Sequence, residues 1–189
     1  MSVRLFVAID VGAEVAAELG RLIERLRPQA PNAKWVAPEN VHVTLSFLGN
    51  VSDELLPSVE RTVTEVAARH PPHVLRVHTG GAFGSRKRPR VLWVGIEGEV
   101  DRLVAAQGDL AEALRPLGFE PEQRAFKPHL TLARARDPGG DAALASCAAE
   151  LAEVDCGQAR IDALVLYRSD LSRSGPRYTA LARPALGAQ

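Results

Sequence analysis

An internal repeat constrains what this chain can fold into more than any other feature of its sequence. Residues 41–45 (VHVTL) match residues 128–132 (PHLTL), and residues 5–9 (LFVAI) match residues 92–96 (LWVGI), each at a spacing of 87 residues. Several matches in one register predict an internal duplication. We therefore expect two related halves, each with one His-x-Thr segment at an equivalent position.

Each His-x-Thr segment has the pattern of a half-buried strand. Because successive side chains of a strand point to opposite faces, His42 and Thr44 share one face. The same spacing places His129 beside Thr131 in the second copy, while the intervening apolar residues face the other way. Two such strands facing each other would form a cleft in which two imidazoles converge on one ligand.

Length and charge limit the possible architectures and partners. The chain has 189 residues, of which 46% are hydrophobic, with 23 basic and 23 acidic side chains. We expect residues 1–189 to form a single domain of two lobes with a pseudo-repeat of about 87 residues. Zero net charge provides no overall field for holding a long nucleic acid, so any such partner should be bound locally, at a strand end.

Nothing in the sequence indicates a membrane or secreted protein. No apolar run approaches the roughly 20 residues of a spanning helix, and the start of the chain leads directly into a predicted strand. Cys147 and Cys156 have neither metal-site nor redox-motif spacing, so we expect free thiols in a reducing compartment. These features predict a cytoplasmic protein with no membrane partner, and the balanced charge favours a monomer.

Alternating strands and helices predict an α+β fold. Strands are expected at residues 4–9, 41–48, 74–77, 91–96, 129–134, 161–167 and 177–181, the last two forming a hairpin across residues 174–176. Helical stripes are formed by Val15, Leu19, Leu22, Ile23 and Leu26; by Leu55, Leu56, Val59, Val63 and Val66; by Val100, Leu103, Val104, Leu110 and Leu114; and by Leu144, Cys147, Ala148 and Leu151. This order favours two lobes, built from two mostly antiparallel sheets backed by helices around a central cleft.

Candidate helix caps follow from the residues that precede the stripes. We expect Asp10 to cap the first helix, Ser52 or Asp53 to cap the second, and Asp141 to start the last.

A glycine-rich basic segment lies between the two halves. Residues 80–90 include Arg86, Lys87, Arg88 and Arg90. The segment is predicted to be a loop, and two interpretations remain open: a solvated hairpin tip, or a loop that steers phosphate groups beside the cleft.

Two facing histidines suit general acid–base catalysis. Imidazole titrates near pH 6.5, so one neutral ring can accept a proton while a protonated ring donates one. A cyclic phosphodiester fits this arrangement, because its leaving oxygen needs a proton and its non-bridging oxygens need hydrogen-bond donors, which the threonines provide. Neither histidine has the neighbouring ligands of a zinc site, so we expect no metal and no cofactor. The other histidines, His70, His73 and His78, follow no repeat and are interpreted as surface or strand-face residues.

The residues around both histidines resemble a known superfamily. Residues 41–49 (VHVTLSFLG) and 124–134 (RAFKPHLTLAR) resemble the motifs of the two-histidine (2H) phosphoesterases. Within that superfamily the chain is most similar to the RNA 2',3'-cyclic phosphodiesterases, historically named 2'-5' RNA ligases. Residues 4–9, 89–93 and 175–178 extend this resemblance over nearly the whole chain.

The resemblance implies a bilobal fold and metal-independent hydrolysis of RNA or nucleotide 2',3'-cyclic phosphate ends to 2'-phosphomonoesters, with a weak reverse 2'-5' ligation. It implies that His42 and His129 are the catalytic pair and that Thr44 and Thr131 hold the phosphate. We assign His42 as the acid and His129 as the base, although the sequence alone also permits the reverse order.

Three further residues correspond to substrate contacts. Phe47 and Arg124 match positions that sandwich the terminal base in the family, and Arg134 ends its strand within reach of phosphate. Strict strand alternation, however, places Phe47 on the core side with Val43 and Leu45, unless the strand bulges there.

Two alternative functions stay open. One is a non-catalytic module that binds nucleotides or RNA ends. The other is a related phosphodiesterase that acts on 2'-5' oligonucleotides or on ADP-ribose cyclic phosphate.

Overall fold

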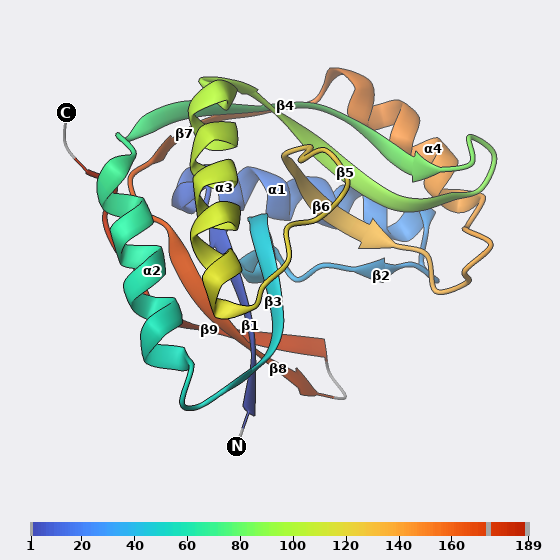
Figure 1. Cartoon of the computed structure of the whole chain (residues 1–189). Coiled ribbons are helices and arrows are strands. Elements are labelled where there is room, and N and C mark those ends of the chain that lie inside the picture. The colour runs from blue at the N-terminus through green and yellow to red at the C-terminus, as the bar shows by residue number, and fades with distance from the viewer. Residues whose placement is uncertain (1, 173–174, 188–189) are drawn as a thin grey trace.

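The computed structural model describes residues 2–172 and 175–187, which form two antiparallel sheets with packed helices (Figure 1). The first sheet has the strand order β3-β1-β8-β9, and the second has the order β2-β6-β5-β4-β7. The strands are β1 (Ser2–Ile9), β2 (Lys34–Trp35), β3 (Val43–Ser52), β4 (His73–Gly84), β5 (Pro89–Gly98), β6 (His129–Arg134), β7 (Asp155–Ile161), β8 (Val165–Ser172) and β9 (Gly175–Ala182). The helices are α1 (Gly12–Leu26), α2 (Leu56–Arg69), α3 (Val100–Leu114) and α4 (Ala143–Glu150). The predicted α+β class is confirmed.

Each sheet is completed by strands from the other half of the chain. β8 and β9, from the C-terminal half, extend the first sheet beside β1, and β4, from the N-terminal half, lies between β5 and β7. The helices also cross over, because α1 packs against β7 of the second sheet and α3 packs against β3 of the first. The two lobes are therefore interleaved, with β1 and β5 at equivalent central positions.

Helix α1 forms where the apolar residues recur at helical spacing. Its predicted stripe is fully buried: Val15, Leu19, Leu22, Ile23 and Leu26. Such a stripe buries one face of the helix against a sheet while charged residues cover the opposite face.

The helix caps differ from those predicted. α1 has Val11 at its N-cap with no side-chain hydrogen bond, because the Asp10 carboxylate instead accepts a hydrogen bond from the Tyr167 hydroxyl (2.8 Å) and pairs with Arg183. α2 has Leu55 at its N-cap, again without a side-chain bond, so neither Ser52 nor Asp53 caps it.

The start of the last helix agrees with the prediction. The Ala143 N–H donates to the Asp141 carboxylate at 2.9 Å, directly before α4.

The predicted loop at residues 80–90 is mostly strand. β4 continues to Gly84 and β5 begins at Pro89, which leaves only residues 85–88 as the turn. A Cβ at Gly80 would lie 2.6 Å from the Trp93 carbonyl oxygen, and one at Gly81 would lie 3.1 Å from the Trp93 ring. These glycines therefore permit close contact between strands, which the sequence alone does not distinguish from a flexible loop.

Two other expectations are wrong in detail. Val104 of α3 is 41% exposed, and Ala106 is buried in its place on the inner face. Ile161 ends β7 in the second sheet, so the terminal hairpin is formed by β8 and β9 alone. Its predicted tip at Ser174 lies outside the described residues.

The cysteines agree with the sequence-based expectation. Cys147 and Cys156 are free and buried. Among the described residues, no helix has both the length and the apolar character needed to cross a membrane.

Candidate active site

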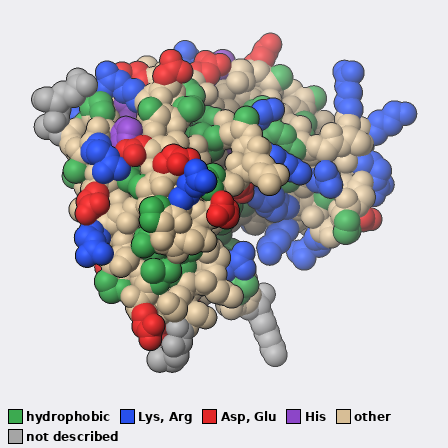
Figure 2. All heavy atoms as spheres, in the orientation of Figure 1, with side chains coloured by type: hydrophobic (Ala, Val, Ile, Leu, Met, Phe, Trp, Pro, Cys, Tyr) green, Lys and Arg blue, Asp and Glu red, His purple; other side chains and the backbone are tan. Residues whose placement is uncertain are grey.

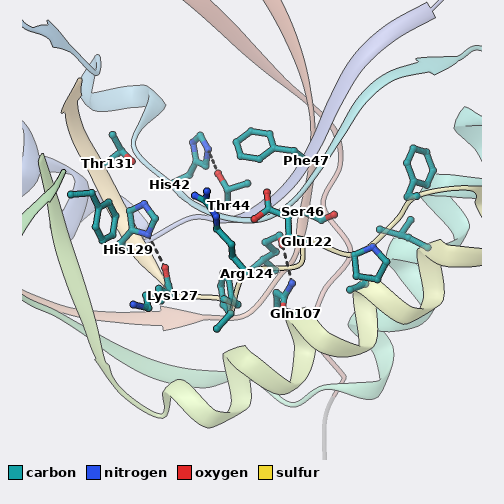
Figure 3. A pocket seen from close by; sticks show the side chains of 18 of the residues that line it. His42, Thr44, Ser46, Phe47, Gln107, Glu122, Arg124, Lys127, His129 and Thr131 are labelled. Carbon is teal, nitrogen blue, oxygen red and sulfur yellow. Dashed lines mark hydrogen bonds between the residues drawn. The ribbon is translucent and has the colours of Figure 1, made fainter. Parts of the chain in front are cut away.

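A cavity of about 750 Å³ lies between the two sheets, and both His-x-Thr segments line it (Figure 3). Its other walls come from the last turns of α3, from the segment 119–127, and from single residues of β4 and β9. The four basic residues of the segment 80–90 do not line this cavity, whereas every residue predicted to be catalytic or to contact substrate does: His42, Thr44, Phe47, Arg124, His129, Thr131 and Arg134. The fold therefore brings both copies of the repeat to one place.

The two imidazoles are held in the same way. His42 Nδ1 lies 2.8 Å from the Asn40 carbonyl oxygen, and His129 Nδ1 lies 2.7 Å from the Lys127 carbonyl oxygen. A carbonyl can only accept a hydrogen bond, so Nδ1 carries the proton in both rings. Each neutral ring therefore has an unprotonated Nε2 that can accept a proton.

Thr44 contacts the Nε2 edge of the first ring. Its Oγ1 lies 3.0 Å from His42 Nε2 (Figure 3). The hydroxyl donates to the neutral ring and accepts from the protonated one, so it supports both protonation states.

Aromatic packing encloses His42. Its ring stacks on Phe6 at a centroid distance of 4.8 Å and meets the ring of Tyr178 edge-on at 5.3 Å. Burial lowers the pKa of His42 below the ordinary 6.5, while the hydrogen bond to the Asn40 carbonyl and the charge of Asp10 oppose this shift. In the free protein, His42 is therefore biased toward its neutral form.

His129 has a simpler environment. Its ring meets Phe83 of β4 edge-on, with centroids 5.1 Å apart. Phe83 in turn stacks on Trp93 at 5.3 Å. This contact fixes the ring from one side.

Phe47 lies in the cavity, so the core placement predicted by strict alternation is wrong. Its side chain is 62% exposed, whereas Leu45 and Leu48 on either side are buried. The ladder between β1 and β3 is irregular between Leu5 and Phe6, and again between Val7 and Ala8. These irregularities reverse the alternation along β3 and turn the Phe47 ring toward the cavity, as the bulge alternative required.

Basic side chains contribute the charge of the cavity. Arg124, Lys127 and Arg134 line it, and all three are exposed. Within residues 2–172 and 175–187, none of them has a carboxylate at ion-pair distance. Two acidic residues, Glu120 and Glu122, also line the cavity. The unpaired cations make it suitable for an anionic ligand.

Several residues of the site were not predicted from the sequence. The Asn40 side chain donates to the Pro176 carbonyl oxygen (3.0 Å), which ties the turn before His42 to β9. Tyr178, two residues further along β9, lines the cavity beside His42. Residues 175–178 carry part of the family resemblance, which was the available signal for this contact.

Gln107 is the other unpredicted contact. It reaches the cavity from α3, and its side chain donates to the Leu45 carbonyl oxygen at 3.4 Å (Figure 3). No feature of the sequence indicates this contact, because it depends on the crossing of α3 to the first sheet.

The remaining histidines lie outside the cavity. His70 Nε2 is 2.9 Å from Asp109, and His78 Nδ1 is 3.5 Å from Glu97. His73 begins β4 and is only 2% exposed, so of the two interpretations it is a strand-face residue and not a surface residue. In the described parts of the chain, no three His, Cys, Asp or Glu side chains are grouped so that they could hold a metal ion.

Known proteins share both the sequence and the fold. The model of the LigT like Phosphoesterase family matches residues 9–93 and again residues 94–178, with one histidine of the pair in each match. RNA 2',3'-cyclic phosphodiesterase of Methanothermobacter thermautotrophicus is 32% identical, covering 95% of this chain and 96% of its own. The enzyme of the same name from Archaeoglobus fulgidus is 33% identical, covering 94% and 97%.

Solved structures agree with these matches. Escherichia coli LigT complexed with 3'-AMP has a TM-score of 0.77 and 29% identity, covering 98% of this chain and 99% of that one. TT0787 of Thermus thermophilus has a TM-score of 0.75 and 31% identity, with the same coverage. The duplicated two-sheet architecture and the double family match lead to one assignment: the chain belongs to the LigT-like phosphoesterases of the 2H phosphoesterase superfamily.

Proposed function

We propose that this protein hydrolyses the 2',3'-cyclic phosphate at the end of an RNA, or of a nucleotide, to a 2'-phosphomonoester. The observation that carries this proposal is the pair of histidines from the two halves, with the same tautomer, at one cavity. The relatives named RNA 2',3'-cyclic phosphodiesterases support the same substrate class. The reaction needs no metal and no cofactor.

The two rings divide the proton transfers between them. His129 Nε2 accepts a proton from water as the water oxygen bonds to phosphorus. The bond from phosphorus to the 3' oxygen breaks, and the protonated His42 donates its Nε2 proton to that oxygen. The phosphate remains on the 2' oxygen, and proton exchange with solvent restores both rings. A 5'-hydroxyl in place of water would give a 2'-5' linkage, which is the reverse ligation.

The surroundings of His42 support its assignment as the acid. Burial that lowers its pKa makes the protonated ring a stronger proton donor. The negative charge of a bound phosphate favours the protonated ring, so substrate binding itself promotes protonation of His42.

The hydroxyls and cations stabilise the phosphorus centre. We assign Thr44 and Thr131 as hydrogen-bond donors to the non-bridging oxygens, whose charge grows in the transition state. Arg134 contributes positive charge from the end of β6. Phe47 and Arg124 line the cavity as a pair of planar groups that can enclose the terminal base.

Alanine variants of the two histidines test the proposal. His42→Ala and His129→Ala should each lower kcat/KM for a nucleoside 2',3'-cyclic phosphate by about 10²- to 10⁴-fold, the usual contribution of a general acid or base. EDTA should leave turnover unchanged. Full activity in either variant would refute the assignment, and tight AMP binding without turnover of any cyclic phosphate would favour the binding-module alternative.

A substrate with sulfur in place of the bridging 3' oxygen separates the two roles. A thiolate leaves without protonation, so this substrate needs no acid. It should restore turnover to His42→Ala but not to His129→Ala. Restoration of His129→Ala instead would reverse the assignment.

A further inference from the structure

Several basic side chains at one end of the cavity have no acidic partner within the described residues, unlike Arg88 of the β4–β5 turn, which lies 3.7 Å from Asp137. On the helices, Arg69 pairs with Asp109 at 3.0 Å and Arg102 pairs with Glu99 at 3.2 Å. Among the described residues, a group of cations at the β4–β5 end has no carboxylate at ion-pair distance, and we call it the basic rim: Lys34, Arg86, Lys87 and Arg134. Unpaired cations are available to an external anion.

The sheet register places this group along the edge of the cavity. Lys34 of β2 lies opposite Arg134 of β6, Arg134 lies opposite Val91 of β5, and Val91 lies opposite Phe83 of β4. Side chains opposite each other in a sheet share a face. Since Arg134 and Phe83 both line the cavity, Lys34 lies on the same face, directly beyond its margin.

The β4–β5 turn continues this row. Arg86 lies two residues beyond Gly84, the last residue of β4, in the turn that joins β4 to β5. Lys and Arg side chains crowd this end of the molecule in the space-filling view (Figure 2), where Figure 1 places the turn. The basic surface therefore extends outward from the cavity.

The turn is anchored in a way that leaves two of its cations available. Arg88 donates from Nη2 to the Gly140 carbonyl oxygen (2.7 Å), and its N–H donates to the Ser85 hydroxyl (3.0 Å). A Cβ at Gly140 would lie 2.1 Å from the Arg88 carbonyl oxygen, so the turn packs tightly there. Arg86 and Lys87 are exposed on this fixed backbone and make no hydrogen bond within the described structure.

We infer that the basic rim binds the phosphates of single-stranded RNA upstream of the terminal nucleotide. This inference rests on the proposed function, which places the RNA end in the cavity. The RNA upstream of this end carries one phosphate per nucleotide. The basic rim presents a row of cations that begins at the cavity and leads away from it. Neither Arg86 nor Lys87 lines the cavity, so a mononucleotide held by the cavity walls does not depend on them.

Binding of product-ended oligonucleotides tests this surface without requiring turnover. The probes are RNAs of one to about eight nucleotides that end in a 2'-phosphate. For the longest probe at about 50 mM salt, Arg86→Ser/Lys87→Ser should raise Kd about tenfold and reduce the slope of log Kd against log salt by about 1.4, or 0.7 per lost phosphate contact. Turnover of a nucleoside 2',3'-cyclic phosphate should stay within about twofold, because this substrate ends inside the cavity.

The matched control removes the same charge elsewhere. Arg61 of α2 and Arg160 of β7 are exposed and, within the described chain, have no carboxylate partner, so Arg61→Ser/Arg160→Ser lowers the net charge equally. An equal loss of RNA affinity in both double variants would mean that only overall charge matters, and it would overturn the inference. An affinity of the parent protein that does not rise with RNA length would also overturn it. A third outcome separates the two proposals. If Arg86→Ser/Lys87→Ser abolishes the dependence of affinity on RNA length, but the parent protein does not turn over the nucleoside substrate, RNA binding by the basic rim is supported and the proposed function is refuted.

Discussion

At the scale of single residues, both histidines are oriented by the backbone two positions before them. Asn40 and Lys127 have different side chains, but each offers its carbonyl oxygen to the Nδ1–H of the following histidine. Any residue can supply a backbone carbonyl, so the residue types at these positions do not indicate this hydrogen bond. The sequence predicted the two rings and their faces, whereas the fixed tautomer became visible only in the structure.

The titration of His42 is a residue-scale prediction. Burial disfavours the charged ring, so its pKa in the free protein should lie below 6.5, and histidine NMR signals followed against pH should give that midpoint. The Asp10 charge stabilises the imidazolium, so Asp10→Asn should lower the midpoint further, whereas Asp101→Asn on α3 should not change it. A midpoint at or above the ordinary value in the parent protein would contradict this description.

At the scale of elements, the irregular pairing of β3 determines the shape of the site. Regular pairing with β1 would bury Phe47 among the core leucines. The cavity would then lose the aromatic side chain that β3 contributes to its wall. The two irregularities in the β1–β3 ladder turn the ring outward while Leu45 and Leu48 stay buried. A bulge of this kind changes the direction of one side chain at little cost to the rest of the sheet.

Removal of the Phe47 ring should affect binding and not stability. Stacking of a base on an aromatic ring contributes about 1–3 kcal/mol, so Phe47→Ala should raise KM about 5- to 150-fold. The ring is 62% exposed, so the melting temperature should stay close to that of the parent. Leu171→Ala on β8, at a side chain that is 71% exposed, is the control and should change neither quantity. An unchanged KM for Phe47→Ala would mean that Phe47 does not stack on the terminal base.

The elements themselves were largely predictable, because apolar periodicity reports which face of a segment is buried. The stripe of α1 and the position of β6 follow directly from that signal. The predictions that were wrong have physical causes. Gly80 and Gly81 serve strand packing, and the Asp10 carboxylate binds Tyr167 and Arg183 instead of capping α1. Each depends on a partner that is distant in the sequence.

At the scale of the whole molecule, exchange of strands and helices joins the two lobes. β4 and β8 each lie beside the central strand of the other half, so neither sheet is complete within one half of the chain. Local sequence does not specify which strand lies beside which, and this exchange was therefore not predicted. The motifs of the two halves meet in one cavity because the sheets are built this way.

Cooperative unfolding is the expected consequence. Both tryptophans, Trp35 of β2 and Trp93 of β5, report on the second sheet, while Ile9 of β1 is buried in the first. Ile9→Val should lower the free energy of unfolding by about 0.5–1.5 kcal/mol. The denaturation midpoints from tryptophan fluorescence and from circular dichroism should shift together. A shift seen by circular dichroism alone would mean that the lobes unfold independently.

The position of phosphate in the product is the sharpest test of the proposed hydrolysis. An oligonucleotide ending in a 2',3'-cyclic phosphate is incubated with the protein in EDTA, and phosphorus NMR identifies the phosphomonoester formed. The proposed mechanism predicts a 2'-phosphate, because it has His42 protonate the departing 3' oxygen while His129 activates water. A 3'-phosphate, or turnover that requires an added metal, would contradict it.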